Sequence, residues 1–243
     1  MLEKAYVRFR ENIPDNANTY AAAEGFAMQG VPVVPFYGFG DLNLGNMPDL
    51  GREAIVCGNL GDVWTALDLL GRPRPAELDY PEHLSWMLGR DIRRVSLGEV
   101  REGTRRCHLK PVQQKLFGGF VYDPLDPRSR LAVAIYPDDT PCFASDEVEL
   151  VSEYRCFFRG DKPVGVKHYR GDAFTALDKA TYNKAVKCCK GKMPAAYCLD
   201  MGVAADGRTL LVEATDAFAV GSYGLLGLPY ARFLEARWLE LVG

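Results

Sequence analysis

The sequence predicts a mixed α/β (α+β) protein, with a small α/β domain followed by a larger, β-rich part. Three observations carry this prediction. The first third alternates strand, helix and strand, a proline-rich stretch at 72–75 interrupts the pattern, and closely spaced strand-like runs follow residue 105. With 243 residues, of which 48% are hydrophobic and 25% charged, the chain has the composition of a globular protein.

The first third shows periodic runs separated by glycine and proline. Asn18 is positioned to cap a helix that Gly30 ends, and Gly71 ends a second helix. The order of strand, helix and strand predicts a parallel sheet. The expected elements are strands at 5–9, 31–35 and 55–57 and helices at 21–28 and 62–70.

The remainder divides into a connection and a strand-rich part. We expect an N-terminal domain at 1–80, a connecting segment at 81–104 with a short helix at 82–88, and a second domain at 105–243. The Asp-Gly pair within 205–208 is a strong hairpin signal. The expected strands are 107–111, 120–122, 131–135, 147–151, 154–158, 163–168, 197–203 and 209–213, and the expected helices are 174–190 and 229–242, the latter with Phe233, Trp238 and Leu241 inward.

Charge and cysteine content limit the classes of function and location. The formal net charge of −3 argues against a general nucleic-acid binder. The seven cysteines form no C-x-x-C pair and several lie in apolar runs, which is typical of buried free thiols in a reducing compartment. The N-terminus shows no signal peptide and no run is long enough to span a membrane, so we expect a cytoplasmic protein.

A first candidate site surrounds Lys110, at the end of a predicted strand. Gly118 and Gly119 follow it in a short connection, and Lys115 lies between. A lysine supplies a point charge for phosphate, and a Gly-Gly backbone approaches an anion closely. The Walker A pattern is absent. Alone, this motif is weak and favours a plain hairpin that carries two solvated lysines.

A second candidate site is a pair of carboxylates, Asp200 and Glu213, on either side of the predicted hairpin turn. The hairpin brings these like charges opposite each other within apolar strands, which is unfavourable unless a cation compensates them. Mg²⁺ bound by one or two carboxylates and nucleotide phosphates would do so. The alternative is that arginines neutralise each carboxylate. Asp216 follows as a third candidate ligand.

A third constellation lies on two neighbouring predicted strands. Alternation places Glu153 and Arg155 on one face of the strand at 154–158, while Lys167 and Arg170 lie along the strand at 163–168 or just after it. An acid and a base at this spacing are usually a surface ion pair. With the neighbouring glutamates at 147 and 149, these residues are also compatible with a charged cleft.

The order of these motifs resembles the ATP-grasp superfamily, and within it the clade of short proteins named for two arginines and a lysine. Four pieces carry the resemblance over about residues 105–240: Lys110-Pro111 with Gly118-Gly119, the strand 152–155, the hairpin from Leu199-Asp200 to Val212-Glu213, and the segment 216–224, followed by Tyr230 and 236–238. The resemblance implies an ATP-grasp fold of antiparallel sheets flanked by helices, behind a small N-terminal α/β domain.

The resemblance also implies an ATP-dependent carboxylate–amine ligase that forms an acyl phosphate with Mg²⁺. Its substrates would be ATP, a carboxylate on a small molecule, peptide or protein, and an amine. It assigns phosphate binding to Lys110 and Lys115, adenine and ribose binding to Glu147, Glu149, Val151 and Glu153, metal binding to Asp200, Glu213 and Asp216, and catalytic roles to Arg155, Lys167 and Arg170.

Two positions depart from the family's pattern. Thr215 stands where an asparagine is common at the second metal position, and Cys198 stands where many ligases carry an arginine, a role that Arg155 would take over. Two alternatives therefore stay open beside the ligase: a nucleotide-binding regulatory or interaction module without turnover, and a phosphotransferase that leaves a phosphorylated product. The sequence does not identify the carboxylate or the amine.

Overall fold

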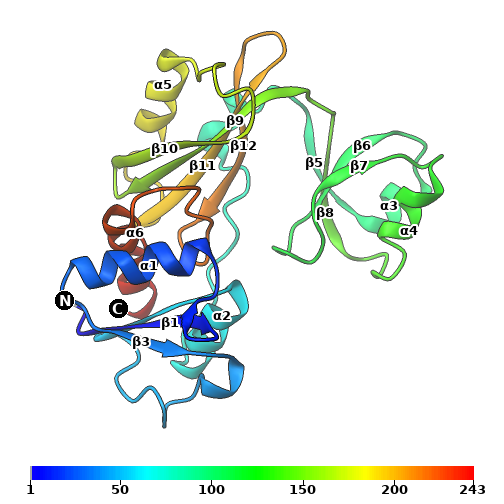
Figure 1. Ribbon diagram of the computed structural model, residues 1–243. Coiled ribbons are helices and arrows are strands. Elements are labelled where there is room, and N and C mark those ends of the chain that lie inside the picture. Colours follow the sequence, from blue (N-terminus) through cyan, green and yellow to red (C-terminus); the bar gives the residue numbers. More distant parts are fainter. Residues whose placement is uncertain (1) are drawn as a thin grey trace.

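The computed structural model describes residues 2–243, which form three sheets and the helices packed on them (Figure 1). The N-terminal sheet contains β1 (Lys4–Arg10), β2 (Ile13–Pro14), β3 (Val33–Phe36) and β4 (Ala54–Cys57). Strand β1 pairs in parallel with β3 and β4, while β2 returns antiparallel beside the end of β1. The parallel sheet expected for the first third is confirmed.

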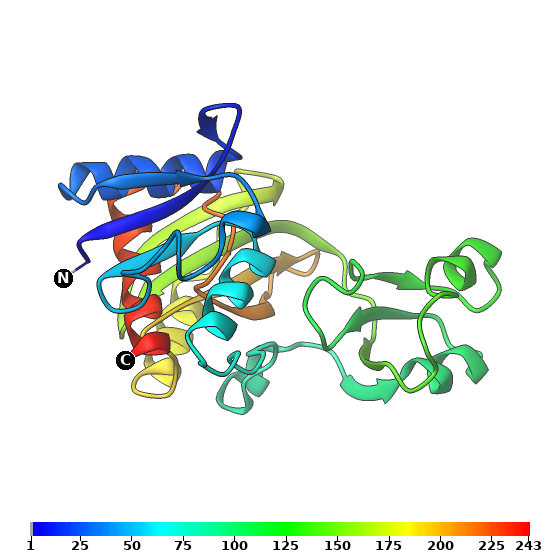
Figure 2. The ribbon, with the colours of Figure 1, turned by 90° about the horizontal axis from the view of Figure 1, so that it is seen from below.

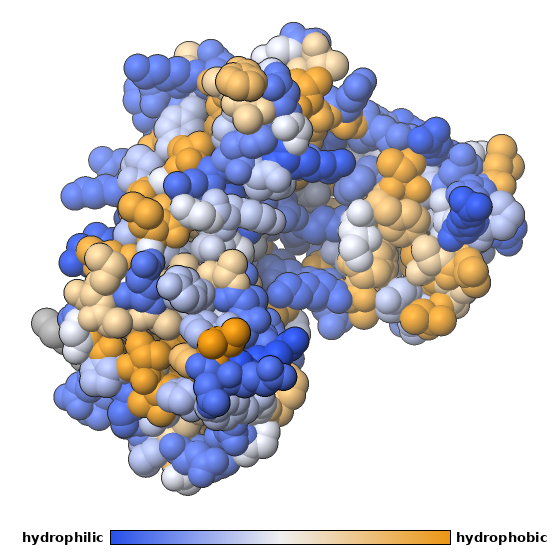
Figure 3. Space-filling model, in the orientation of Figure 1, coloured by the Kyte–Doolittle hydropathy of each residue, from blue (hydrophilic) through white to orange (hydrophobic). Residues whose placement is uncertain are grey.

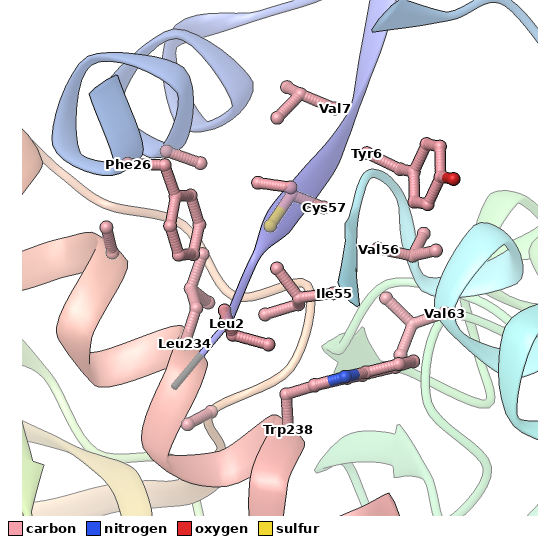
Figure 4. Packing of buried hydrophobic residues seen from close by; sticks show 14 of the residues in the cluster. Leu2, Tyr6, Val7, Phe26, Ile55, Val56, Cys57, Val63, Leu234 and Trp238 are labelled. Carbon is pink, nitrogen blue, oxygen red and sulfur yellow. The ribbon is translucent and has the colours of Figure 1, made fainter. Parts of the chain in front are cut away.

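Helices cover this sheet because β4 and the centre of β1 are apolar and buried on both faces. The helices of this region are α1 (Ala17–Met28), the 3₁₀ turn η1 (Phe39–Asp41), α2 (Leu60–Leu69) and the C-terminal α6 (Gly227–Val242). Figure 4 shows Phe26 of α1 and Leu234 and Trp238 of α6 packed against Ile55 and Cys57 of β4. The C-terminal helix thus completes the core of the N-terminal domain.

Two antiparallel sheets make up the rest of the chain. One, which we call the main sheet, has the order β10-β9-β11-β12; the other, which we call the lid sheet, has the order β5-β8-β6-β7. The main sheet contains β9 (Leu150–Arg159), β10 (Lys162–Gly171), β11 (Ala196–Ala204) and β12 (Thr209–Asp216). The lid sheet contains β5 (Ile92–Ser96), β6 (Cys107–Pro111), β7 (Phe120–Tyr122) and β8 (Pro141–Ser145).

Each antiparallel sheet has its own core. Helix α5 (Lys179–Cys189) and the 3₁₀ helix η2 (Glu82–Met87) pack on one face of the main sheet, and α1 and α6 lie between its other face and the N-terminal sheet. The lid sheet packs on α3 (Leu97–Glu102) and α4 (Pro127–Ala132) and projects from the body in both ribbon views (Figures 1 and 2). The predicted fold class of antiparallel sheets flanked by helices is confirmed.

Several expected elements differ in place or type. The run 131–135 is not a strand, because Asp126 caps a helix whose first residue is Pro127; the Asp126 side chain accepts from Arg128 N–H at 3.0 Å. Strand β9 begins only at Leu150, and α5 begins at Lys179 rather than at 174 because Asp178 caps it. Among residues 2–243, no helix is long and apolar enough to cross a membrane.

The region 81–104, expected as a connection, contains β5 and α3 of the lid sheet. Strand β5 lies at the edge and pairs only with β8, which the sequence analysis also missed. Both strands are short and begin or end beside proline or charged residues, so neither shows a clear alternating pattern. Their pairing depends on contacts between segments about 50 residues apart.

Helix α1 is capped by Asn16 rather than by Asn18. The Asn16 side chain accepts from Thr19 N–H at 3.2 Å and the Thr19 hydroxyl accepts from Asn16 N–H at 2.9 Å, which is a capping box. Asn18 instead turns toward the loop before α6, where its side-chain oxygen accepts from Ser222 N–H at 2.8 Å. This contact ties the start of α1 to the segment 217–224.

We predict that Gly25→Ala destabilises the protein by about 1–3 kcal/mol, because it overpacks the crossing of α1 and α6. A Cβ at Gly25 would lie 1.9 Å from the Gly227 carbonyl oxygen, so the helices would have to separate. Urea unfolding measures the effect. The control is Ala27→Gly on the exposed face of α1, which should cost about 1 kcal/mol from helix propensity alone. Equal stability of Gly25→Ala and wild type would contradict this packing.

Candidate functional site

A cleft of about 730 Å³ lies between the lid sheet and the main sheet. Figure 3 shows the surface hollowed between the lid sheet, on the right, and the rest of the molecule, with hydrophilic side chains along the hollow. The segment around residue 79 and the loop 217–224 close the cleft at its sides. Its ionisable lining residues include Asp79, Lys110, Lys115, Glu153, Arg155 and Glu213.

Lys110 reaches the cleft because β6 alternates between two environments. Cys107 and Leu109 enter the core of the lid sheet, so His108 and Lys110 face the cleft. The Lys110 ammonium lies 2.5 Å from Asp79 Oδ1 and 2.5 Å from Glu213 Oε2. Burial by itself would lower the pKa of Lys110, but these two carboxylates outweigh it and raise the pKa, so the ammonium stays charged.

Asp200 lies at the centre of the main sheet, directly between Arg155 of β9 and Glu213 of β12 in the ladder register. The guanidinium of Arg155 donates two hydrogen bonds to the Asp200 carboxylate, at 2.7 Å from Nε and 2.6 Å from Nη2. Asp200 is only 3% exposed, and this burial raises its pKa while Arg155 acts in the opposite direction. The predicted hairpin therefore brings the two carboxylates together, and each faces a cation.

Arg155 also connects the main sheet to the loop before α6. Its Nη1 lies 3.4 Å from the Gly221 carbonyl oxygen, and its guanidinium lies 4.7 Å from the centre of the Tyr223 ring. Tyr223 stacks on Tyr169 of β10 at 4.8 Å. Arg155 is therefore fixed from two sides at the floor of the cleft.

Glu153 lies two residues before Arg155 on the same face of β9 and also lines the cleft. Its carboxylate accepts from the Tyr169 hydroxyl at 2.8 Å and from Arg170 Nη1 at 2.9 Å. Arg170 itself is 76% exposed in its side chain, at the sheet edge. Lys167 pairs with Arg155 across the ladder but is not among the residues that line the cleft.

The other predicted site residues have different surroundings. Asp216 accepts two hydrogen bonds from Arg237 of α6 at 2.7 and 2.6 Å and does not line the cleft, whereas its neighbour Thr215 does. Lys115 lines the cleft at a positive φ of 59°, and burial lowers its pKa. The segment 147–151 connects the lid sheet to the main sheet, and there Glu147 pairs with Arg106 at 2.9 Å.

Asp79 and His108 are the main lining residues that the sequence analysis missed as site residues. Asp79 stands between two prolines in a segment without periodicity, so its only signal is a carboxylate in a proline-flanked run. His108 stands two residues before Lys110, and alternation alone would have placed it on the same face. Burial lowers the pKa of His108, so its imidazole is neutral near pH 7.

The site matches what Mg²⁺ and phosphate require in proteins. Asp200 and Glu213 lie opposite each other, with Arg155 and Lys110 as their present cationic partners, and Mg²⁺ is commonly held by one or two carboxylates together with phosphate oxygens. A cage made by the protein alone is not present, since residues 2–243 contain no group of three histidine, cysteine or acidic side chains arranged for a metal. The residues therefore suit a metal that arrives with a nucleotide.

Solved structures with a similar fold span nearly the whole chain. They include ATP-grasp ligase PsnB complexed with minimal precursor (12% identity, TM-score 0.56, 98% of this chain and 100% of that one). They also include a RimK domain protein ATP-grasp from Sphaerobacter thermophilus DSM 20745 (15%, 0.58, 95% and 98%). A third is the D-alanine–D-alanine ligase from Bacillus anthracis complexed with ATP (13%, 0.56, 98% and 94%). At these identities the likeness concerns the fold.

A comparison with curated proteins finds no match. At the sequence level, residues 87–233 match the ATP-grasp domain of family 2 in the clade named for two arginines and a lysine. This range covers more than half of the chain and contains Lys110, Arg155, Asp200 and Glu213. The resemblance noted from the sequence is confirmed: the chain belongs to family 2 of this clade of ATP-grasp domains.

Proposed function

We propose that this protein is an ATP-dependent ligase that joins a carboxylate to an amine. The observation that carries the proposal is the convergence of Lys110 and Glu213, from strands of two different sheets, on one cleft of about 730 Å³, with Asp200 directly opposite Glu213 in the main sheet. ATP-grasp ligases share this fold, and the chain belongs to an ATP-grasp family. ATP would lie between the lid sheet and the main sheet.

The lid sheet supplies the groups for the phosphates. Lys110 and Lys115 would neutralise them, and the backbone at Gly118 and Gly119 would approach them closely. A Cβ at Gly119 would lie 3.2 Å from the His108 ring, so the glycine also leaves space for that side chain. These contacts position the triphosphate without any covalent step.

The connection between the two sheets and the start of β9 would hold the nucleoside. Glu147, Glu149 and Val151 are the candidates for contacts with adenine and ribose, and Glu153 is the candidate on the floor of the cleft. Glu153 is buried, and its oxygens accept hydrogen bonds from Tyr169 and Arg170. A ribose hydroxyl would replace one of these donors.

Asp200 and Glu213 would hold Mg²⁺, which neutralises phosphate charge when bound. We leave Asp216 out of this set, because neither it nor its partner Arg237 lines the cleft, whereas Asp200 lies opposite Glu213 and its partner Arg155 lines the cleft. The carboxylate of the substrate attacks the γ-phosphorus of ATP, the bond to the β-phosphate oxygen breaks, and ADP leaves. The amine then attacks the acyl carbon of the acyl phosphate, inorganic phosphate leaves, and the amine loses a proton.

Arg155 is the strongest candidate for stabilising the transferring phosphoryl group. Asp200 fixes two of its nitrogens, and Nη1 remains on the side of the loop 217–224. A guanidinium held in this way stabilises charge without reorganising during the reaction. Arg170 and Lys167 are weaker candidates, because Arg170 is mostly exposed and Lys167 lies outside the cleft lining.

The solved relatives inform the class of substrate. PsnB is described with a precursor, and the Bacillus anthracis enzyme ligates D-alanine to D-alanine. For this chain we therefore propose carboxylates and amines of amino acids, peptides or protein termini. Asn18, where the N-terminal domain meets the loop 217–224, lines the cleft and would lie on the substrate side.

The test is calorimetric titration of ATP with and without Mg²⁺ into wild type and Glu213→Gln. Glu213 has a side-chain exposure of 29%, so the variant should keep its fold. We expect Mg²⁺ to strengthen ATP binding by wild type and to have little effect in the variant. Carboxylate–amine pairs are then screened for ADP release. If wild type shows no ATP binding under either condition, the proposal is wrong.

One observation favours a module that binds nucleotide without turnover. Thr215 lines the cleft where related proteins commonly carry asparagine, so the second metal position has a weaker ligand. Such a module would bind Mg·ATP but release no ADP with any acceptor. A phosphotransferase, in contrast, would release ADP with the carboxylate alone and accumulate a stable phosphorylated product.

A further inference from the structure

Asp79, in the segment from Glu77 to Tyr80, lines the cleft although it precedes the ATP-grasp match, which begins at residue 87. Asp79 Oδ1 lies 2.5 Å from the Lys110 ammonium, and the Tyr80 ring centre lies 5.5 Å from the same group. Glu77 accepts from Gln114 N–H at 3.4 Å, beside the proposed phosphate-binding loop. Three neighbouring side chains of this segment therefore contact Lys110 or the loop that follows it.

The backbone of Asp79 is fixed against β12. Its carbonyl oxygen accepts from Ala214 N–H at 2.7 Å, and the two residues form an antiparallel bridge. Asp79 has a positive φ of 39°, a conformation that aspartate and asparagine adopt more readily than most residues. The residue is 7% exposed, so its carboxylate has little freedom to move away from Lys110.

An aspartate at this place is unfavourable for ATP binding by charge alone, because its carboxylate repels phosphate. Lys110 explains its presence. An ammonium has three N–H donors, and Asp79 and Glu213 accept two of them. Glu213 is also a proposed Mg²⁺ ligand, so metal and lysine compete for its oxygens. Asp79 has no metal partner in that arrangement and stays with Lys110.

We propose that Asp79 is a positioning residue for Lys110. It holds the ammonium on the β12 side of the cleft, so that the remaining N–H donors meet the phosphates while Glu213 binds the metal. The inference rests on the proposed ATP-binding function. It extends the site to a segment outside the matched domain.

The test compares Asp79→Asn with wild type by calorimetry of ATP in the presence of Mg²⁺. Asparagine keeps the size of the side chain and tolerates positive φ, so the variant changes the charge and little else. We expect the Kd for Mg·ATP to rise about tenfold. If Asp79 acted only as a repelling anion, the Kd would fall instead. A Kd of Asp79→Asn equal to or lower than that of wild type would overturn the proposal.

Two controls separate positioning from general effects. In a Lys110→Met background, Asp79→Asn should no longer weaken binding, since the residue acts through the lysine. Asp206→Asn, in the exposed turn between β11 and β12, removes the same charge and should leave the Kd unchanged. Additive losses in the double variant would overturn the assignment.

A measurement without nucleotide distinguishes this inference from the proposed function. Lys110 acylation by an amine-reactive reagent is followed by peptide mass spectrometry. In Asp79→Asn the ammonium loses the carboxylate that holds it at 2.5 Å, so the labelling rate of Lys110 should increase while the rates of Lys162 and Lys190 stay constant. Unchanged Lys110 labelling would overturn the positioning role even if ATP binds. Increased labelling in a protein that binds no ATP would overturn the proposed function and, with it, any role toward phosphate.

Discussion

Asp200→Asn is expected to reduce carboxylate-dependent ADP release by roughly a hundredfold or more, which is the largest effect on activity that we predict. The substitution removes the central carboxylate of the proposed metal site and loosens the hold on Arg155, which donates two hydrogen bonds to it. ADP release is measured in a coupled assay with an acceptor pair identified by screening. Activity equal to wild type would mean that Asp200 is not a metal ligand.

Stability must be controlled in this experiment, because Asp200→Asn leaves the buried guanidinium of Arg155 without its counter-charge. The double variant Arg155→Gln with Asp200→Asn restores charge balance. We expect it to be more stable to urea than Asp200→Asn and to remain inactive. Recovery of activity together with stability would show that the single variant fails through folding rather than through chemistry.

Arg237→Met is expected to destabilise the protein by about 3–5 kcal/mol, the largest stability effect that we predict. Arg237 is the partner of Asp216, which is 1% exposed and would be left as an unpaired buried charge. The pair joins α6 to the end of β12, so its loss affects the packing of the N-terminal domain on the main sheet. Urea unfolding followed by circular dichroism measures the change.

The compensated variant Asp216→Asn with Arg237→Met tests the role of Asp216 at the same time. Removing both charges should recover most of the lost stability, because no buried charge remains unpaired. Since neither Asp216 nor Arg237 lines the cleft, we also expect the variant to keep Mg²⁺-dependent ATP binding. Loss of that binding in a stable double variant would show that Asp216 is a metal ligand after all.

Local patterns in the sequence determined much of the fold and part of the site. The strand-like run 107–111 predicted β6 with Lys110 near its end, and the Asp-Gly turn predicted the hairpin that places Asp200 opposite Glu213. The order of strand, helix and strand in the first third predicted the parallel sheet. These features depend on neighbours within a few residues, so their physical causes are visible in the chain itself.

Only the tertiary structure decided which charges are neighbours. Whether Asp216 faces a metal or Arg237 depends on how α6 packs, and the place of Asp79 depends on a bridge to Ala214, 135 positions further along the chain. Strands β5 and β8 form a sheet only because they meet each other, as neither has a strong pattern alone. Such long-range pairs are stabilised by burial and by partners that no local propensity encodes. For this reason the sequence predicted Lys110, Asp200 and Glu213 as site residues, but not Asp79, which contacts Lys110.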